Sequence, residues 1–218
     1  MNLPELFAHP FSSYCQKALV ALYENGTAFT YRNLEDPQAR GTLAALWPLQ
    51  RFPLLRDKGR TVMEASIIIE YLDLHHPGPR PLVPRDPEQA WQVRLLDRFF
   101  DNYIATPQQK IVFDSLRPPE LRDVHGVAEA RRMLGTAYEW LEGHMDGREW
   151  AVGGHFSLAD CAAAPFLFYA DWTHAIAPRF ERVHGYRQRL LARPSFARAV
   201  EEGRPFRHYF PLGAPDRD

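Results

Sequence analysis

A proline-rich segment near residue 80 divides this chain into two parts of different character. Five prolines and one glycine fall between His75 and Pro87. Proline lacks a backbone N–H and fixes φ, so neither a helix interior nor a central strand continues through such a segment. We therefore predict a linker at residues 77–87, between a first domain at 1–76 and a second at 88–204, with a C-terminal tail at 205–218.

Strand-like and helix-like segments alternate only before this linker. Short apolar runs predict strands at 3–8, 28–33, 52–56 and 61–63, and helical spacing of apolar residues predicts helices at 14–24, 38–45 and 65–75. After the linker the spacing is helical throughout, with segments around 91–103, 128–145, 158–172 and 186–191, the last ending near Pro194. The tail contains Pro205, Pro211, Gly213 and Pro215, which predict a surface coil that frays. The chain should thus be an α/β domain followed by an all-α domain.

The sequence Phe52-Pro53-Leu54-Leu55 places a proline at the first position of an apolar strand. X-Pro bonds are the ones that adopt cis at tolerable cost, and a proline at a strand start removes no central ladder bond. We expect a cis Phe52–Pro53 bond, which would leave the Phe52 N–H and C=O free to pair with an extended peptide. An ordinary edge strand is the alternative explanation.

Two predicted helices begin with residues suited to binding an anion. One follows Glu64, and the other follows Ser12-Ser13-Tyr14-Cys15, where hydroxyls, a phenol and a thiol gather. The unpaired N–H groups of a helix N-terminus favour negative charge, and both a carboxylate and a thiolate are anions. Together with Phe52, these residues predict a site for a small peptide that carries a thiol and a free carboxylate.

With these motifs in this order, the chain resembles a cytosolic glutathione transferase. The segment Gly154-His155-Phe156-Ser157-Leu158-Ala159-Asp160 resembles the helix-start signature of that family, and Ser157 with Asp160 should form a capping box. The resemblance covers roughly residues 3 to 200. It implies a thioredoxin-like α/β N-terminal domain, an all-α helical bundle, glutathione as co-substrate, and a homodimer.

The resemblance also suggests which residue contacts the glutathione thiol. In related sequences a reactive cysteine or serine lies five positions before a basic residue, and counting back from Lys17 gives Ser12. Ser12 is therefore expected to donate to the thiolate, with Ser13, Tyr14 and Cys15 as further candidates. The alternative is that Ser12 serves only as a helix cap.

The other site residues match the pattern of the family less closely. Glu64 and its successor should hold the γ-glutamyl end, but the usual serine is replaced by Ala65, and the hydroxyl occurs at Ser66. One hydrogen bond to a charged carboxylate, worth about 1.5–3 kcal/mol, is thus missing or replaced. Arg51 lies where the family often places a basic residue near the glycyl carboxylate, although it could equally be a solvated surface arginine. Residues expected to line an acceptor pocket between the domains are Tyr103, Tyr169, Trp172 and His174, and ordinary core packing is their alternative role.

Composition limits the remaining possibilities. A formal charge of −1 argues against nucleic-acid binding as the main task, and two cysteines, Cys15 and Cys161, suggest a reducing compartment. The nine histidines show no ligand spacing, so we expect no metal. No apolar run approaches the length of about 18 residues that spans a membrane, and the N-terminus lacks signal-peptide features, so we expect a cytoplasmic protein.

Three functions remain open at this point. The first is an enzyme that adds glutathione to a small apolar electrophile or uses it in reduction or isomerisation. The second is a thiol-disulfide oxidoreductase, which Cys15 alone supports poorly. The third is a transferase-like interaction module without turnover, which the substitution at Ala65 keeps possible.

Overall fold

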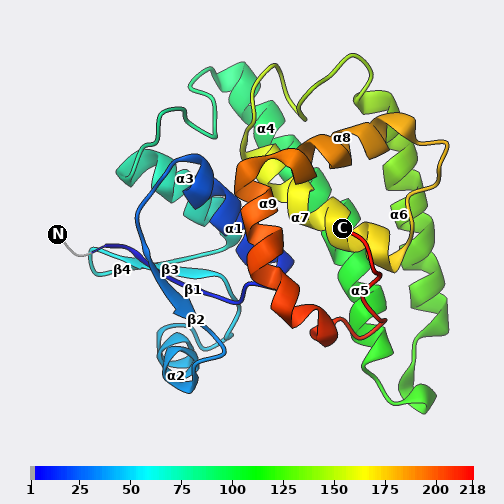
Figure 1. Ribbon diagram of the computed structural model, residues 1–218, viewed down its shortest axis with the longest axis horizontal. Helices are drawn as coiled ribbons and strands as arrows, with labels where there is room; N and C mark the ends of the chain where they lie inside the picture. The colour runs from blue at the N-terminus through cyan, green and yellow to red at the C-terminus, as the bar shows by residue number, and fades with distance from the viewer. Residues whose placement is uncertain (1–2) are drawn as a thin grey trace.

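The computed structural model describes residues 3–218, so the first two residues of the predicted domain 1–76 lie outside the described part. The N-terminal region is a four-stranded sheet with strand order β2-β1-β3-β4 and three helices (Figure 1). Strands β1 and β2 are parallel, whereas β3 is antiparallel to both β1 and β4. The elements are β1 (Glu5–Ala8), α1 (Ser13–Glu24), β2 (Thr30–Asn33), α2 (Pro37–Leu46), β3 (Leu54–Asp57), β4 (Arg60–Met63) and α3 (Ala65–His75).

The two faces of this sheet are covered by different helices. Leu6 and Leu55 pack with residues of α1 and α3, whereas their neighbours Phe7 and Leu54 pack with residues of α2. Successive side chains of a strand point to opposite faces, so this alternation places α1 and α3 on one side and α2 on the other. Helix α1 is also packed against α7 and α9, which joins the sheet region to the helical region.

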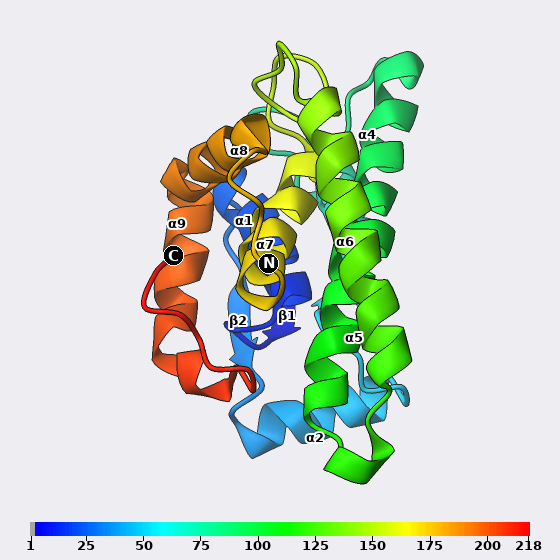
Figure 2. The ribbon, with the colours of Figure 1, turned by 90° about the vertical axis from the view of Figure 1, so that its right-hand side faces the viewer.

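The region after residue 86 is entirely helical. Helices α4 and α5 form one long, bent column through the π-helical segment η1, beside α6; α7 runs between this layer and the layer of α8 and α9 (Figure 2). Pro107 lies in the first turn of α5, where its missing N–H is tolerated. The elements are α4 (Pro87–Phe99), η1 (Phe100–Ala105), α5 (Thr106–Ser115), η2 (Pro119–Leu121), α6 (Val124–His144), α7 (Leu158–Thr173), α8 (Glu181–Ala192), α9 (Pro194–Gly203) and η3 (Arg204–Tyr209).

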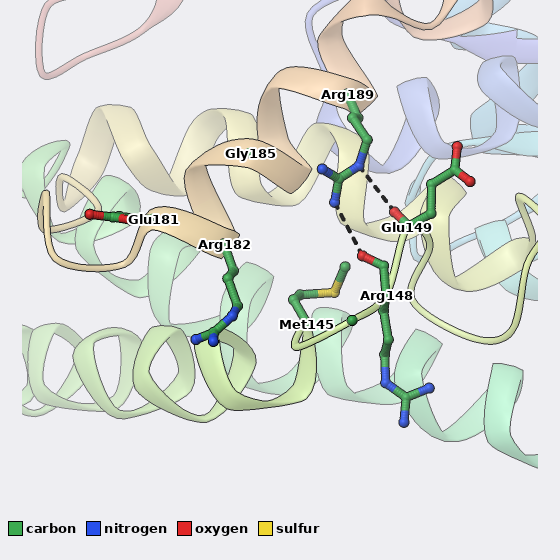
Figure 3. Close-up of a pocket in the computed structure, with 8 residues that line it drawn as sticks. Met145, Arg148, Glu149, Glu181, Arg182, Gly185 and Arg189 are labelled. Atoms are coloured by element: carbon green, nitrogen blue, oxygen red, sulfur yellow. Dashed lines mark hydrogen bonds between the residues drawn. The ribbon is translucent and has the colours of Figure 1, made fainter.

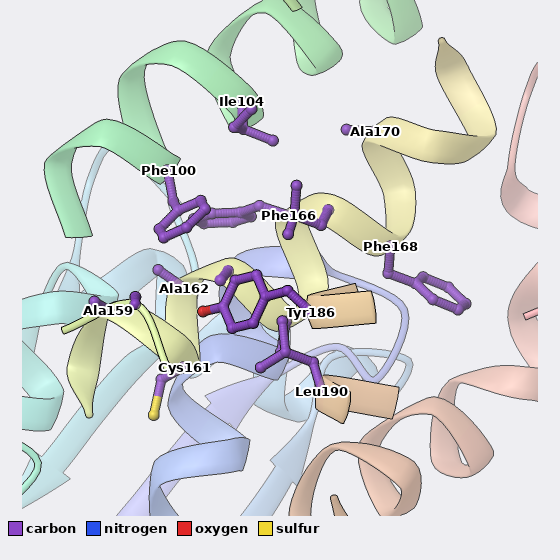
Figure 4. Packing of buried hydrophobic residues seen from close by; sticks show 14 of the residues in the cluster. Phe100, Ile104, Ala159, Cys161, Ala162, Phe166, Phe168, Ala170, Tyr186 and Leu190 are labelled. Carbon is purple, nitrogen blue, oxygen red and sulfur yellow. The ribbon is translucent and has the colours of Figure 1, made fainter. Parts of the chain in front are cut away.

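Helix α7 is the centre of the main hydrophobic core, as its nearly continuous apolar sequence predicts. Phe166 packs among Phe100, Tyr186 and other buried side chains (Figure 4). The predicted pairing at the start of α7 is present, because the backbone N–H and the hydroxyl of Ser157 both donate to Oδ2 of Asp160 at 2.9 Å. Asp160 also accepts from the Tyr186 hydroxyl at 2.6 Å, so this buried carboxylate ties α7 to α8.

The predicted helix around 186–191 is α8, which ends at Ala192, near Pro194 as expected. Pro194 itself occupies the first turn of a further helix, α9, which the sequence-based prediction did not include. The predicted coil after it begins with the 3₁₀ segment η3. This segment and the residues after it are attached rather than free, since Tyr209 of η3 donates to Glu35 at 3.2 Å and Arg217 donates to Asp171 at 2.5 Å.

Candidate functional site

A cleft of about 630 Å³ lies between the sheet region and the helical region. Its lining residues come from the segments that the sequence singles out, together with α4, η1, α5, α7 and the C-terminal segment. They are Phe11, Ser12, Ser13, Tyr14, Trp47, Gln50, Arg51, Phe52, Pro53, Met63, Glu64, Ala65, Arg98, Asp101, Asn102, Gln108, Gln109, Val112, Phe113, Tyr169, Tyr209, Phe210 and Pro211.

Ser12 lies in the cleft at the N-terminus of α1. Its Oγ accepts a hydrogen bond from the backbone N–H of Cys15 at 3.4 Å, so it caps the helix as expected. The cap uses the hydroxyl oxygen as an acceptor and leaves the hydroxyl proton free to donate to a bound anion. The two roles that the sequence left as alternatives are therefore compatible.

The loop that carries Ser12 is held by His9. The His9 carbonyl accepts from the Ser12 N–H, and its Nδ1 accepts from the Phe11 N–H, each at 3.1 Å. Because Nδ1 is an acceptor, the ring proton lies on Nε2, which is 3.0 Å from Glu35 Oε1. These contacts of one histidine fix the loop before α1.

Of the other candidates in this helix, Ser13 and Tyr14 line the cleft and Cys15 does not. The Cys15 side chain is fully buried, and its Sγ accepts from the His9 N–H at 3.4 Å. Burial raises the pKa of the Cys15 thiol to about 12, so it is not a thiolate at neutral pH. Burial, and then the negative charge of Asp101, raise the pKa of Tyr14 to about 12, which keeps its phenol protonated.

The Phe52–Pro53 bond is cis, and Phe52 is 41% exposed at the cleft. Within residues 3–218, neither the N–H nor the C=O of Phe52 has a hydrogen-bond partner. These two groups can therefore pair with an extended ligand without breaking an existing bond. Arg51, beside them, is exposed, lines the cleft and has no ion-pair partner within the same residues.

The start of α3 forms another wall of the cleft. Glu64 is exposed and has a φ of +69°, in the region that non-glycine residues seldom occupy, and Ala65 is the first helical residue. Ser66 does not line the cleft. It is buried, donates to Asp97 Oδ2 at 2.8 Å and accepts from Lys17 Nζ at 2.9 Å. The hydroxyl expected to replace the serine missing at position 65 is thus occupied elsewhere.

Only Tyr169 of the four expected acceptor-pocket residues lines the cleft. Trp172 packs behind it, with its ring centroid 5.4 Å from those of Tyr169 and Phe210. His174 stacks on Tyr138, and Tyr103 is half exposed beside Phe99, both away from the cleft. The sequence reasoning missed other lining residues of the helical region and the tail, namely Arg98, Asp101, Asn102, Gln108, Gln109, Val112, Phe113, Tyr209, Phe210 and Pro211.

A second hollow, of about 570 Å³, lies between α8 and the loop after α6 (Figure 3). Arg189 crosses it and donates to the backbone carbonyls of Glu149 and Arg148 at 3.2 and 3.4 Å. No residue singled out from the sequence lies there. Within residues 3–218 there is also no group of three or more potential metal ligands and no helix long and apolar enough to cross a membrane. The first cleft is therefore the candidate site.

The fold defines a protein with a thioredoxin-like N-terminal half and an all-helical C-terminal half, with the cleft between them. A family model of the glutathione S-transferase N-terminal domain matches residues 6–80, and a model of the C-terminal domain of the same family matches residues 125–189. This chain belongs to the glutathione S-transferase family.

Individual relatives are distant but extend over most of the chain. A probable maleylacetoacetate isomerase of Caenorhabditis elegans is 24% identical over 93% of this chain and 95% of its own length. The probable glutathione S-transferase GSTU1 of Oryza sativa subsp. japonica is 29% identical over 77% of this chain and 74% of its own. A glutathione S-transferase structure from Methylobacterium radiotolerans, in complex with glutathione sulfonate, has a TM-score of 0.77 and 28% identity, covering 90% of this chain and 94% of that one.

Proposed function

We propose that this protein is a glutathione transferase that holds the glutathione thiolate beside Ser12 and adds it to a small electrophile. One observation carries the proposal. The cleft brings together the N-terminus of α1, the unpaired backbone groups of Phe52 and the N-terminus of α3. These suit the thiol, the peptide backbone and the γ-glutamyl carboxylate of glutathione, with Arg51 near its glycyl carboxylate. The glutathione sulfonate in the Methylobacterium relative supports this ligand class.

The chemistry requires the thiol to ionise near neutral pH. A free thiol has a pKa near 8.5, and lowering it by about two units takes about 2.7 kcal/mol of preferential stabilisation of the anion. The Ser12 hydroxyl and the first N–H groups of α1 are the donors proposed for this task. The thiolate then forms a C–S bond to the electrophile, a halide or other leaving group departs with its electron pair, and the thiol proton passes to solvent.

The acceptor would bind beside Tyr169, Val112 and Phe113. This part of the cleft also contains Gln108, Gln109 and Asn102, so its walls are both apolar and hydrogen-bonding. We infer an electrophile with an apolar body and at least one polar group. This refines the expectation of a small apolar electrophile.

Isomerisation is the second candidate, because the nematode relative that matches nearly its whole length is a probable maleylacetoacetate isomerase. In that reaction glutathione adds to a double bond and leaves again after rotation, so the same thiolate site would serve. A disulfide-exchange activity is disfavoured, since Cys15 and Cys161 are both fully buried. A homodimer remains our proposal from the family resemblance, and a cytoplasmic location without a nucleic-acid or membrane partner remains our proposal from the composition.

Calorimetry with reduced glutathione, followed by turnover assays, tests the proposal. We expect binding, conjugation of a nitro-activated aryl halide, and no reduction of a mixed disulfide. Isomerisation of a maleyl compound without conjugation would favour the second candidate. Binding without any turnover would favour an interaction module, and absence of binding would overturn the proposal.

A further inference from the structure

The γ-glutamyl end of glutathione carries both an α-carboxylate and an α-ammonium group, and the start of α3 offers too little to hold them. Ala65 contributes only its backbone N–H, and Ser66 Oγ is engaged in buried contacts. Some other groups must supply the missing charged contacts if this peptide is the ligand. Two cleft-lining residues of the helical region, Arg98 and Asp101, carry opposite charges.

Arg98 is placed to receive a carboxylate. Its side chain is 50% exposed at the cleft. Nη2 lies 2.7 Å from Asp97 Oδ2 and donates to Ser66 Oγ, and Nε donates to Asp97 at 3.2 Å. Within residues 3–218, the hydrogen bonds of Arg98 come from Nε and Nη2, and Nη1 makes none. The contacts of Nε and Nη2 thus orient the guanidinium, and Nη1 can donate a charge-assisted hydrogen bond to a ligand carboxylate.

The buried Lys17 holds the carboxylate of Asp101 in place. Lys17 Nζ lies 3.0 Å from Asp101 Oδ1, and Arg98 contacts Oδ2. Burial raises the pKa of Asp101, whereas Lys17 and Arg98 act in the opposite direction. An incoming ammonium group would stabilise its ionised form.

The charges of this cluster argue for a zwitterion rather than a simple anion or cation. Lys17 and Arg98 balance Asp97 and Asp101, and Glu64, which lines the same cleft, adds one negative charge. An amino-acid end group brings one charge of each sign, so its carboxylate would pair with Arg98 and its ammonium with Asp101 and Glu64.

From this geometry we propose that Arg98 and Asp101 of the helical domain bind the α-carboxylate and the α-ammonium of the γ-glutamyl group, in place of the side chain that Ala65 lacks. Lys17 acts as a positioning residue that holds Asp101 and, through Ser66, the start of α3. The inference rests on glutathione being the ligand. It adds that the helical domain binds the γ-glutamyl end of glutathione, and that the charged groups of Arg98 and Asp101 come from the same protomer.

The test compares glutathione with two analogues by calorimetry. In one analogue glutaryl replaces γ-glutamyl and the ammonium is absent; in the other 4-aminobutyryl replaces it and the carboxylate is absent. Arg98→Gln should weaken glutathione binding about ten- to a hundredfold but leave binding of the carboxylate-free analogue unchanged. Asp101→Asn should show the reverse selectivity, with the ammonium-free analogue unaffected. Arg94→Gln is the matched control, because Arg94 lies one turn earlier on α4, pairs with Glu70 at 2.8 Å and does not line the cleft.

Each result has one meaning. The Arg98 assignment is overturned if wild type binds glutathione and Arg98→Gln weakens the binding of glutathione and of the carboxylate-free analogue equally. It is also overturned if Arg98→Gln weakens the binding of neither ligand. If Asp101→Asn fails to fold, the wild-type protein tests the Asp101 assignment. Equal affinities for the ammonium-free analogue and for glutathione would overturn that assignment, and a tenfold or greater loss of affinity for the analogue would support it. If wild type binds none of the three, the proposed function fails instead.

Discussion

Lys17 Nζ lies 2.6 Å from Oδ1 of Asp97, so a lysine of α1 is paired with an aspartate of α4 across the boundary between the two halves of the protein. Lys17 is fully buried and Asp97 nearly so. A charged group buried at this depth requires a partner of opposite charge. Without one, its pKa would shift toward the neutral form or the site would unfold. The pair therefore couples the stability of the helical domain to that of the sheet region.

We predict that Lys17→Met lowers the free energy of unfolding by about 3–5 kcal/mol at neutral pH, because it leaves Asp97 and Asp101 without their buried partner. The pKa of Asp101 is already raised by burial, and loss of Lys17 raises it further. An acid whose folded pKa exceeds its unfolded value binds more protons when folded, so the penalty should shrink as pH falls toward the unfolded value. Urea unfolding at several pH values measures this.

Lys110→Met provides the comparison for that experiment. Lys110 is a surface residue whose Nζ lies 3.4 Å from Asp123, and such pairs contribute less than about 1 kcal/mol. Equal losses in the two variants, or a Lys17→Met loss that does not change with pH, would contradict the buried pairing.

The second prediction concerns the thiol of bound glutathione. Ser12→Ala should raise its pKa by about one to two units, since one hydrogen bond to a charged group is removed. The thiolate absorbance at about 240 nm, titrated with saturating glutathione, reports this pKa. Ser13→Ala is the control and should change it less. The Ser12 variant should also lose about 1 kcal/mol of stability with its helix cap, so a stability loss without a pKa shift would leave Ser12 as a cap alone.

The third prediction is that neither cysteine takes part in the chemistry. Burial raises the pKa of the thiols of both Cys15 and Cys161, and both side chains are fully buried. We expect Cys15→Ala to keep kcat/KM within about twofold while losing about 1 kcal/mol of stability for its lost packing. Mass spectrometry after iodoacetamide treatment should find no adduct on the folded protein and two on the denatured one. Rapid modification of folded Cys15 would refute this.

Local motifs predicted the frame of the site well, because each is set by residues close together in the sequence. The strand that starts at Phe52-Pro53, the cap at Ser12 and the Ser157–Asp160 pairing all depend on a few consecutive residues. The position of the Ser66 hydroxyl, away from the cleft, has a geometric reason. Successive helical residues point about 100° apart, so moving a hydroxyl by one position from Ala65 turns it from the cleft toward Lys17 and Asp97.

The part of the cleft lined by the helical region and the C-terminal segment could not be predicted, because it is assembled from distant segments. The π-helical η1 changes which face of the α4–α5 column is presented, and the cleft is lined by Asn102 rather than by its neighbour Tyr103. Phe210 and Pro211 belong to a tail whose prolines predicted a fraying coil. Contacts such as Tyr209 with Glu35 hold that tail in place, and they join residues far apart in the sequence.

The last prediction concerns Asp57, which joins β3 to the end of α3. Its Oδ2 lies 2.6 Å from Nε2 of His76 and accepts from the Tyr71 hydroxyl at 2.9 Å. Burial alone would raise its pKa, but the contacts with His76 and Tyr71 outweigh it and hold the pKa below the ordinary value of 3.8. A carboxyl with a lowered folded pKa stabilises the protein above its unfolded pKa and loses that contribution as pH falls through the folded one.

Asp57→Asn should therefore lower the free energy of unfolding by about 1.5–3 kcal/mol at neutral pH, since hydrogen bonds to a charged acceptor are replaced by weaker ones. The difference from wild type should shrink as pH falls below the ordinary value of 3.8 and vanish once Asp57 is protonated in the folded protein too. Asp36→Asn is the matched control. Asp36 caps α2 through Gln38, and asparagine caps equally well, so that variant should stay within about 0.5 kcal/mol of wild type at neutral pH. If the Asp57→Asn difference persisted in acid, it would have to come from packing rather than from the charge.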